Sequence, residues 1–303
     1  MYIGNVKINL NYYTGQDFYS DGSIESEILD LVKDENNDIT KILAEDNRWP
    51  ILYHLSPIRR NLLEGFESNF GSSVLEIGAG CGALTGLLCE NASKVVAIEL
   101  SKRRAEIIAH RHKTFSNLEI IIGNLNAIEI EENSFDCITL IGVLEYATQF
   151  TGGETPEETF LNNIKSKLKI GGKLIIAIEN KFGLKYWNGS REDHTGRLFD
   201  GLENYPGTNA KARTFSKNEL TQILTSLKFS KIDYYYPLPD YKMPTQVFSE
   251  GYLPRKGNLN ITTPNYDMDK ILLFNEKLVY ENLVESGYFD IFANSFLVIC
   301  EKV

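Results

Sequence analysis

The sequence predicts a doubly wound α/β fold, in which a mostly parallel sheet is covered by helices on both faces. Short runs rich in Val and Ile alternate with stretches whose apolar residues recur at helical spacing. This alternation is typical of βαβ units, because parallel strands need a crossover connection that is usually a helix. A glycine-rich turn, GAGCG at 78–82, follows the first of these runs, where such a strand would pass into its helix.

Five strands are predicted between residues 73 and 180, at 73–77, 94–100, 118–122, 135–141 and 173–178. Helical spacing of apolar residues lies between most of them, and Gly171 and Gly172 end the last of these helices. A further helix begins with a capping box formed by Ser216 and Glu219. Two more strands are expected at 231–236 and 295–302, so the predicted sheet has seven strands.

Three segments fall outside this sheet. Residues 1–70 are mainly helical after about residue 23, residues 180–213 form a Gly- and Asn-rich loop, and residues 237–293 form an insertion dense in Tyr, Pro and Asn. Long segments of this kind inside a compact domain usually cover a functional site. We therefore expect an N-terminal helical lid at 1–70 and a main domain at 71–303, with the loop and the insertion lying over its binding site.

The composition excludes several classes of protein. The 303 residues hold 31 Lys and Arg against 41 Asp and Glu, and this net charge of −10 disfavours a dedicated nucleic-acid binder. No apolar run approaches the roughly 18 residues that span a bilayer, and the N-terminus lacks the pattern of a secretory signal. The four cysteines are scattered without a CxxC pair, so neither a disulfide scaffold nor a metal site is expected. We predict a cytoplasmic protein.

The glycine turn fits the GxGxxG/A pattern of dinucleotide sites, and Glu76 inside the preceding strand distinguishes between ligands. A dinucleotide places its pyrophosphate against the backbone N–H groups of this turn, where a carboxylate would repel it. S-adenosylmethionine has no phosphate and carries an ammonium and a sulfonium group. The charge of Glu76 therefore favours S-adenosylmethionine over NAD.

Two further positions indicate an adenosine-type ligand. Glu99 ends the second strand, where a carboxylate can accept hydrogen bonds from two ribose hydroxyls of either NAD or S-adenosylmethionine. Asn124 follows the third strand, where its amide could contact an adenine edge with Leu125 beside the ring. Each also has a local interpretation, because Glu99 could cap the helix that opens at Ser101 and Asn124 could only turn the chain.

Five motifs resemble the class I S-adenosylmethionine-dependent methyltransferases: VLEIGAGCG (74–82), VVAIELS (95–101), IIGNLNA (121–127), FDCITLIGVLEY (135–146) and LKIGGKLIIAIENK (168–181). The resemblance covers roughly residues 70–235 and implies a seven-stranded Rossmann-like methyltransferase sheet. It implies S-adenosyl-L-methionine as cofactor and S-adenosyl-L-homocysteine as product. The cofactor-binding residues that it implies are Glu76, Gly78, Gly80, Gly82, Glu99, Leu100, Asn124, Leu125, Gly142 and Leu144. The family often has Asp where this sequence has Asn124.

A narrower resemblance lies in YHLSPIRRNLL, ENKFGLKYWNGSREDHTG and YYPLPDYKMPTQVFSEGYLP. These strings are similar to a bacterial group of such enzymes that is often found with glycosyltransferases and surface-polysaccharide genes. The resemblance implies a small-molecule or saccharide acceptor.

The candidate catalytic residues are Glu192, Asp193 and His194, which follow the fifth strand. Ligands of this fold bind at the carboxyl ends of the strands, and a histidine oriented by carboxylates suits a general base. Alternatively, Asp193 and His194 only hold the loop in place. His110 and His112, among basic residues of the second helix, are expected to be solvated.

Aromatic and cationic residues around the expected acceptor are candidates for binding it. They are Tyr13, Tyr53, His54, Tyr146, Lys181, Arg213 and Tyr241. The aromatic side chains are also ordinary packing residues, and Lys181 and Arg213 could equally pair with the excess of acid.

The sequence thus predicts a methyltransferase that acts on an oxygen or nitrogen of a small-molecule or glycan-type acceptor. Two alternatives stay open: a non-catalytic S-adenosylmethionine-binding partner protein, and an NAD-dependent sugar-modifying enzyme. Glu76 disfavours the second, as does the lack of a Tyr-x-x-x-Lys pair after the fourth strand, where Phe150 follows Tyr146. No nucleic-acid partner is expected, and homodimerisation is left open.

Overall fold

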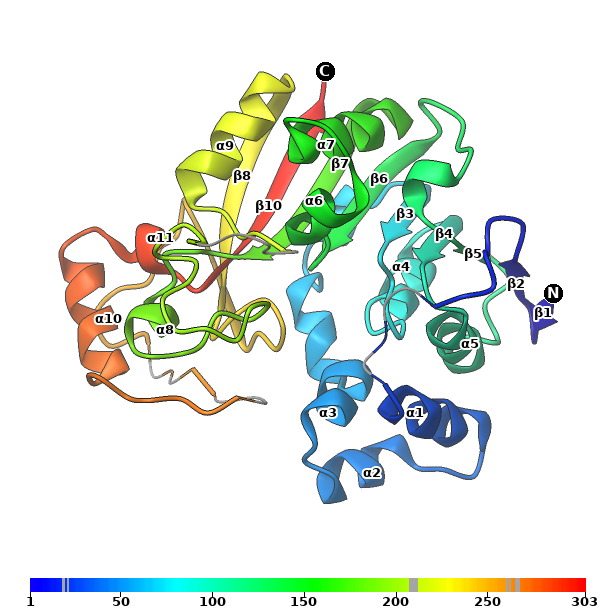
Figure 1. The fold of residues 1–303 in the computed structure, drawn as a ribbon, viewed down its shortest axis with the longest axis horizontal. Helices are drawn as coiled ribbons and strands as arrows, with labels where there is room; N and C mark the ends of the chain where they lie inside the picture. The colour runs from blue at the N-terminus through cyan, green and yellow to red at the C-terminus, as the bar shows by residue number, and fades with distance from the viewer. Residues whose placement is uncertain (18–19, 21, 207–211, 260, 262, 265–267) are drawn as a thin grey trace. The chain divides into compact units, whose positions relative to one another are not determined.

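The computed structural model describes residues 1–303 except 18–19, 21, 207–211, 260, 262 and 265–267 (Figure 1). Parts of the predicted lid, loop and insertion fall on these exceptions and lie outside the described residues. The chain divides into two compact units, Met1–Leu140 with Ile164–Lys173, and Ile141–Asn163 with Leu174–Val303.

The strands of the first unit run in the order β1-β2-β5-β4-β3-β6. They are β1 (Tyr2–Ile3), β2 (Val6–Asn9), β3 (Ser73–Ile77), β4 (Lys94–Glu99), β5 (Leu118–Ile122) and β6 (Phe135–Ile141). In this order every neighbouring pair from β2 onward is parallel, and only β1 and β2 of this unit pair in the antiparallel sense. The Val- and Ile-rich strands β3 and β4 are almost wholly buried, as expected for a parallel sheet covered on both faces.

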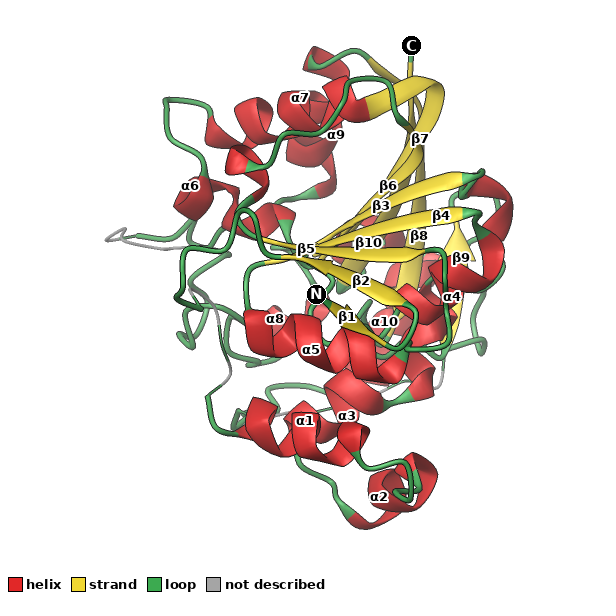
Figure 2. Cartoon of the chain, turned by 90° about the vertical axis from the view of Figure 1, so that its right-hand side faces the viewer, coloured by secondary structure: helices red, strands yellow, loops and turns green. Residues whose placement is uncertain are grey.

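Helices of the first unit are α1 (Ile24–Lys33), α2 (Ile39–Glu45), α3 (Trp49–Leu55), α4 (Thr85–Asn91) and α5 (Lys102–Arg111). Short 3-10 helices cover Pro57–Leu62, Glu67–Asn69 and Leu125–Ala127. Helix α5 contacts strands β2, β4 and β5, and α1 packs on α5 (Figure 2). The helical character predicted for the chain after about residue 23 is confirmed.

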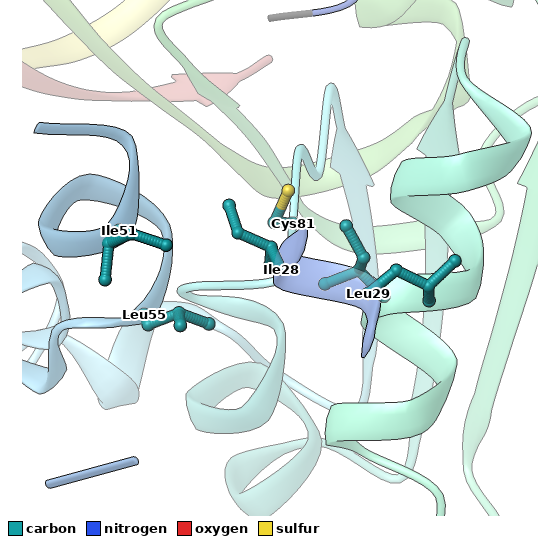
Figure 3. Packing of buried hydrophobic residues seen from close by; sticks show 6 residues of the cluster. Ile28, Leu29, Ile51, Leu55 and Cys81 are labelled. Atoms are coloured by element: carbon teal, nitrogen blue, oxygen red, sulfur yellow. The ribbon is translucent and has the colours of Figure 1, made fainter. Parts of the chain in front are cut away.

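The N-terminal helices pack directly on the glycine turn. Ile28 and Leu29 of α1 and Ile51 and Leu55 of α3 form one buried apolar cluster with Cys81 of the turn (Figure 3). Burying four aliphatic side chains contributes of the order of 1.5–3 kcal/mol each. The turn is therefore supported from outside the sheet by the segment that precedes it in sequence.

The strands of the second unit run in the order β7-β10-β8-β9. Strand β7 (Leu168–Glu179) begins in the first unit; the others are β8 (Phe229–Leu238), β9 (Gln246–Ser249) and β10 (Ser295–Lys302). Strand β8 pairs antiparallel with both β10 and β9. The helices are α6 (Ala147–Phe150), α7 (Pro156–Lys167), α8 (Leu184–Trp187), α9 (Lys217–Ser226), α10 (Glu276–Glu285) and α11 (Phe289–Phe292), with a 3-10 helix at Leu144–Tyr146. The capping box of α9 is formed by Ser216 and Glu219, as predicted.

The α/β class is confirmed, but the predicted count of seven strands is not: ten are described. The additional strands β1, β2 and β9 have two to four residues each. Strands this short lack a periodic pattern, and β2 forms because its backbone pairs with β5 and because Val6 and Ile8 are buried. Among the described residues, no helix is both long and apolar enough to cross a membrane.

Candidate functional site

The glycine turn connects β3 to α4 through three residues with positive φ. Gly78, Gly80 and Gly82 have φ of +70°, +57° and +76°, a region that other L residues rarely adopt. A Cβ built on Gly80 would meet no atom within 4 Å. The backbone at Gly80 is thus open to close approach by a ligand, which is what a glycine at this point of the turn permits.

His112, at the end of α5, contacts this turn and is not solvated as predicted. Its Nε2 lies 2.8 Å from the carbonyl oxygen of Gly82. Burial lowers the pKa of His112 to about 4. The prediction was wrong because the basic sequence around His112 conceals that this position of the helix faces the turn.

Glu99 braces the turn from the end of β4. Its Oε2 accepts a hydrogen bond from the backbone N–H of Gly80 at 2.8 Å, and its Oε1 accepts from the N–H groups of Leu100 and Ser101 at 2.8 and 3.0 Å. Burial raises the pKa of Glu99, partly offset by Arg104 and by these N–H groups. Helix α5 is capped by Ser101 rather than by Glu99, whose hydrogen bonds to the preceding N–H groups fix its carboxylate beside Gly80.

Glu76 is a buried carboxyl group in β3, two residues before the turn. The hydroxyl of Thr85 donates a hydrogen bond to its Oε2 at 2.6 Å. Burial raises the pKa of Glu76 to about 8, despite the opposing effect of this hydrogen bond. A cationic group brought beside Glu76 would favour the ionised carboxylate.

The remaining predicted cofactor residues of the first unit have local roles. The side chain of Asn124 accepts a hydrogen bond from the N–H of Asn126 at 3.0 Å and so caps the 3-10 helix at Leu125–Ala127. Leu125 is buried, and Leu100 is half-buried. The chain-turning interpretation of Asn124 is thus seen directly.

The aromatic candidates of the N-terminal segment are engaged in packing. The guanidinium of Arg59 lies 4.2 Å from the ring centroid of Tyr53. The carbonyl of His54, a buried residue, accepts a hydrogen bond from Arg111 at 2.8 Å. Tyr13 is half-buried and donates a hydrogen bond to Asp17 at 3.2 Å. The packing role that we weighed for these residues accounts for their contacts.

A second group of titratable side chains gathers in the second unit, at and beyond the carboxyl ends of β6 and β7. We call it the carboxylate–histidine cluster, and its members are Glu145, Glu179, Lys185, Glu192, Asp193, His194, Asp240 and Lys242. Five carboxylates face two lysines, so the described side chains of the cluster have a formal charge of −3, or −2 when His194 is protonated.

His194 lies between two glutamates. Its Nδ1 is 3.0 Å from Glu192 Oε1, and its Nε2 is 3.7 Å from Glu145 Oε1. Burial lowers the pKa of His194, but the facing carboxylates Glu145 and Glu192 outweigh it and hold the pKa well above its usual value. Burial also raises the pKa of Glu145. In the ligand-free protein the imidazole therefore keeps both protons at neutral pH, unlike a free general base.

Asp193 anchors the loop through ion pairs. It accepts hydrogen bonds from Lys185 at 2.8 Å and from Tyr186 at 2.5 Å, and it pairs with Lys242. Burial raises the pKa of Asp193, but the two lysines outweigh burial and hold this pKa well below its usual range. The loop-holding alternative fits Asp193, whereas Glu192 directly orients His194.

The predicted residues Gly142, Leu144, Tyr146 and Tyr241 border the cluster. Gly142 has φ +68°, and a Cβ there would lie 2.9 Å from the hydroxyl of Tyr241. The ring of Tyr146 stands edge-on to His194 with centroids 5.4 Å apart. Leu144 is buried beside Glu145. The segment expected to pass the cofactor therefore also carries a member of the cluster.

Lys181 and Arg213 form ion pairs with an acidic side chain, which was the alternative to binding an anionic acceptor. Glu219 Oε1 lies 2.7 Å from Lys181 Nζ and 3.3 Å from the guanidinium of Arg213. The backbone N–H of Arg213 donates to the carbonyl of Glu145 at 2.9 Å, so its main chain reaches the cluster while its side chain does not.

Among the members of the cluster that sequence analysis missed are Glu145, Glu179, Lys185 and Asp240. Glu145 stands in the motif FDCITLIGVLEY, four residues beyond the last residue of strand four, and Glu179 stands in LKIGGKLIIAIENK, directly after the predicted strand five. Their position at the carboxyl ends of parallel strands was the available signal.

Comparison with known proteins finds matches to the central segment of the chain. Residues 75–176 match the family model described as "Methyltransferase domain". A demethylmenaquinone methyltransferase of Tropheryma whipplei is 30% identical over 106 residues, which are 35% of this chain and 41% of that protein. A ribosomal RNA small subunit methyltransferase A of Syntrophus aciditrophicus is 28% identical over 94 residues, 30% of this chain and 34% of that protein. The chain thus spans less than half the length of these curated relatives.

The fold also matches a solved structure. Phosphoethanolamine N-methyltransferase 1 of Haemonchus contortus, in complex with phosphoethanolamine and S-adenosylhomocysteine, superposes with a TM-score of 0.50 at 13% identity. The match covers 92% of this chain and 48% of that one. It supports the Rossmann-like methyltransferase fold.

Proposed function

We propose that the methyltransferase domain at residues 75–176 serves a methyl transfer from S-adenosylmethionine to an oxygen or nitrogen of a small-molecule or glycan-type acceptor. The family match and the resemblance of the five sequence motifs support S-adenosylmethionine as cofactor and S-adenosylhomocysteine as product. When bound, the cofactor supplies a methyl group on a sulfonium, an excellent leaving group.

The residues of the glycine turn fit such a ligand. Glu76 can provide a buried negative charge for an ammonium group, and Gly80 leaves its backbone open to close approach. Glu99, held beside Gly80, still has acceptor capacity for ribose hydroxyls. Leu100, Asn124 and Leu125 would line the adenosine, while Gly142 and Leu144 would border the reacting end.

The acceptor would bind at the carboxylate–histidine cluster. This cluster is the observation that supports an acceptor site in addition to the cofactor site. His194 is oriented by Glu192 and lies in this buried, negatively charged cluster, which includes Glu145 at the end of the segment 142–145. Aligning the acceptor and compensating its proton or charge is the work left to the protein. In this proposal Asp193 fixes the loop, and Tyr146 and Tyr241 contact the acceptor.

The segments around the main domain would complete the site. Residues 1–70, including Tyr13, Tyr53 and His54, would act as a lid, and residues 180–213 and 237–293 would cover the acceptor, with Lys181 and Arg213 at the edge of the loop. The likeness to enzymes found with surface-polysaccharide genes supports a saccharide acceptor in the cytoplasm. The net charge of −10 argues against a nucleic-acid acceptor, although several relatives are named for ribosomal RNA.

The test is methyl transfer from radiolabelled S-adenosylmethionine to a panel of surface-glycan precursors, with the wild-type chain, His194→Gln and the control His110→Gln. Transfer that is lost only in His194→Gln, with S-adenosylhomocysteine binding retained, would support the proposal. If the chain binds S-adenosylhomocysteine but transfers no methyl group, either to the panel or to any molecule of a cell extract, the non-catalytic alternative is favoured. Binding of NAD instead would overturn the argument from Glu76.

A further inference from the structure

Two glutamates of the carboxylate–histidine cluster each have one buried carboxylate oxygen without a hydrogen-bond partner. Glu145 Oε2 and Glu179 Oε2 are both inaccessible to solvent, and their residues are 2% and 0% exposed. An unpaired carboxylate in a buried site costs several kcal/mol unless a cation compensates it. Lys242 Nζ, 2.8 Å from Glu179 Oε1, neutralises only that side of Glu179.

The imidazole of His194 completes a set of possible ligands. One ligand atom each of Glu145, Glu179 and His194 lies within 4.8 Å of the others. The separation of 3.7 Å between His194 Nε2 and Glu145 Oε1 is too long for a hydrogen bond. It is close to the roughly 3.4 Å that separates two ligands of a tetrahedral ion with bonds of about 2.1 Å.

Glu192 orients this histidine as metal-binding histidines are usually oriented. It faces Nδ1 at 3.0 Å and so leaves Nε2 directed at Glu145. A carboxylate on the far nitrogen fixes the tautomer and the plane of a ligating imidazole. Two carboxylates and one imidazole favour a divalent transition metal over Mg²⁺ or Ca²⁺, which prefer oxygen alone.

We propose that Glu145, Glu179 and His194 form a binding site for one divalent transition-metal ion, with Glu192 as the positioning residue of His194. Three protein ligands leave coordination positions open for an oxygen or nitrogen of a substrate. The metal site itself is argued independently of methyl transfer; only its location beside the methyl acceptor rests on the proposed function. Metal binding would displace the proton from His194 Nε2 into solvent, because only the deprotonated nitrogen can ligate, and the ion would compensate the charge of the acceptor.

Direct metal binding tests the site without cofactor or acceptor, so the outcome is independent of methyl transfer. The untagged full chain is titrated with Co²⁺ and Zn²⁺ by calorimetry and by visible absorption of Co²⁺. We expect one ion per chain and Co²⁺ ligand-field bands. His194→Gln and Glu179→Gln should weaken binding about 100-fold or more, and Glu192→Gln about 10- to 100-fold.

Matched controls are His110→Gln on α5 and Glu203→Gln, an exposed glutamate of the 180–213 loop. Both should bind metal like the wild type. Thermal melting and S-adenosylhomocysteine binding show whether each variant is folded. If a cluster variant does not fold, the Co²⁺ spectrum of the wild-type chain is the test instead. A bound Co²⁺ ion that shows no ligand-field bands overturns the proposal. Absence of stoichiometric binding, or equal binding by His194→Gln and His110→Gln, also overturns it.

Discussion

Binding of S-adenosylhomocysteine should release a proton from Glu76, and the affinity should therefore rise with pH. Burial raises the pKa of Glu76 to about 8, so this acid is largely protonated in the ligand-free protein at neutral pH. An ammonium group beside Glu76 interacts favourably with the carboxylate only. The ligand must therefore select the ionised fraction, which grows as the pH approaches 8.

The size of the effect follows from that fraction. With a pKa of about 8, roughly 1% of Glu76 is ionised at pH 6, about 10% at pH 7 and about half at pH 8. The affinity should then rise about fiftyfold between pH 6 and pH 8, or about 2.3 kcal/mol. His112 does not contribute in this window, because burial lowers its pKa to about 4.

Isothermal titration calorimetry at pH 6, 7 and 8, in buffers that differ in ionisation enthalpy, measures both the affinity and the protons released. We expect about 0.9 proton per ligand at pH 7. Two controls isolate Glu76: the variant Glu76→Gln, and the ligand 5′-methylthioadenosine, which lacks the amino-acid group. In neither control should the affinity rise with pH. A change of less than twofold between pH 6 and 8, or a slope that persists in Glu76→Gln, would refute the reasoning.

Three further substitutions test other parts of the structure. His194→Gln should lower turnover about 100-fold or more while the calorimetric affinity for S-adenosylhomocysteine stays within twofold; near-normal initial rates would contradict this. Gly80→Ala, at φ +57°, should cost about 1–2 kcal/mol, seen as a melting temperature about 2–6 °C lower, and should weaken S-adenosylhomocysteine binding at least about tenfold. Arg104→Met removes the partner 2.6 Å from the buried carboxylate of Glu25 and should cost about 3–5 kcal/mol in urea denaturation. Its control Lys102→Met, which breaks a 3.8 Å surface pair, should cost less than about 1 kcal/mol, and equal losses would disprove the assignment.

The central strands, the glycine turn and the α9 capping box could be predicted because their signals are local. A run such as SVLEI is apolar and rich in β-branched residues within five positions, and the turn needs glycines at fixed spacing. The positions of Glu76 and Glu99 relative to that turn follow from the ends of β3 and β4. The sequence therefore determined the fold class and the location of the expected cofactor residues.

The sequence offered no such signal for β1, β2 and β9, or for the side of α5 that places His112 against Gly82. Strands of two to four residues are too short to show a periodic pattern, and β2 in addition pairs with β5, which is distant in sequence. The basic residues around His112 likewise give no sign that this half-buried side chain contacts Gly82.

The carboxylate–histidine cluster was decided by tertiary structure. Glu145, Glu179 and His194 come from three separate segments, and no spacing motif relates them. They meet because β6 and β7 end near one another and because Asp193, held by Lys185 and Lys242, returns the loop to those ends. Local patterns specify which residues turn, pair or cap, whereas the approach of distant side chains depends on packing of the whole chain. The sequence by itself determined a methyltransferase-like fold with its glycine turn, and only the tertiary structure brought together the buried charges of the carboxylate–histidine cluster.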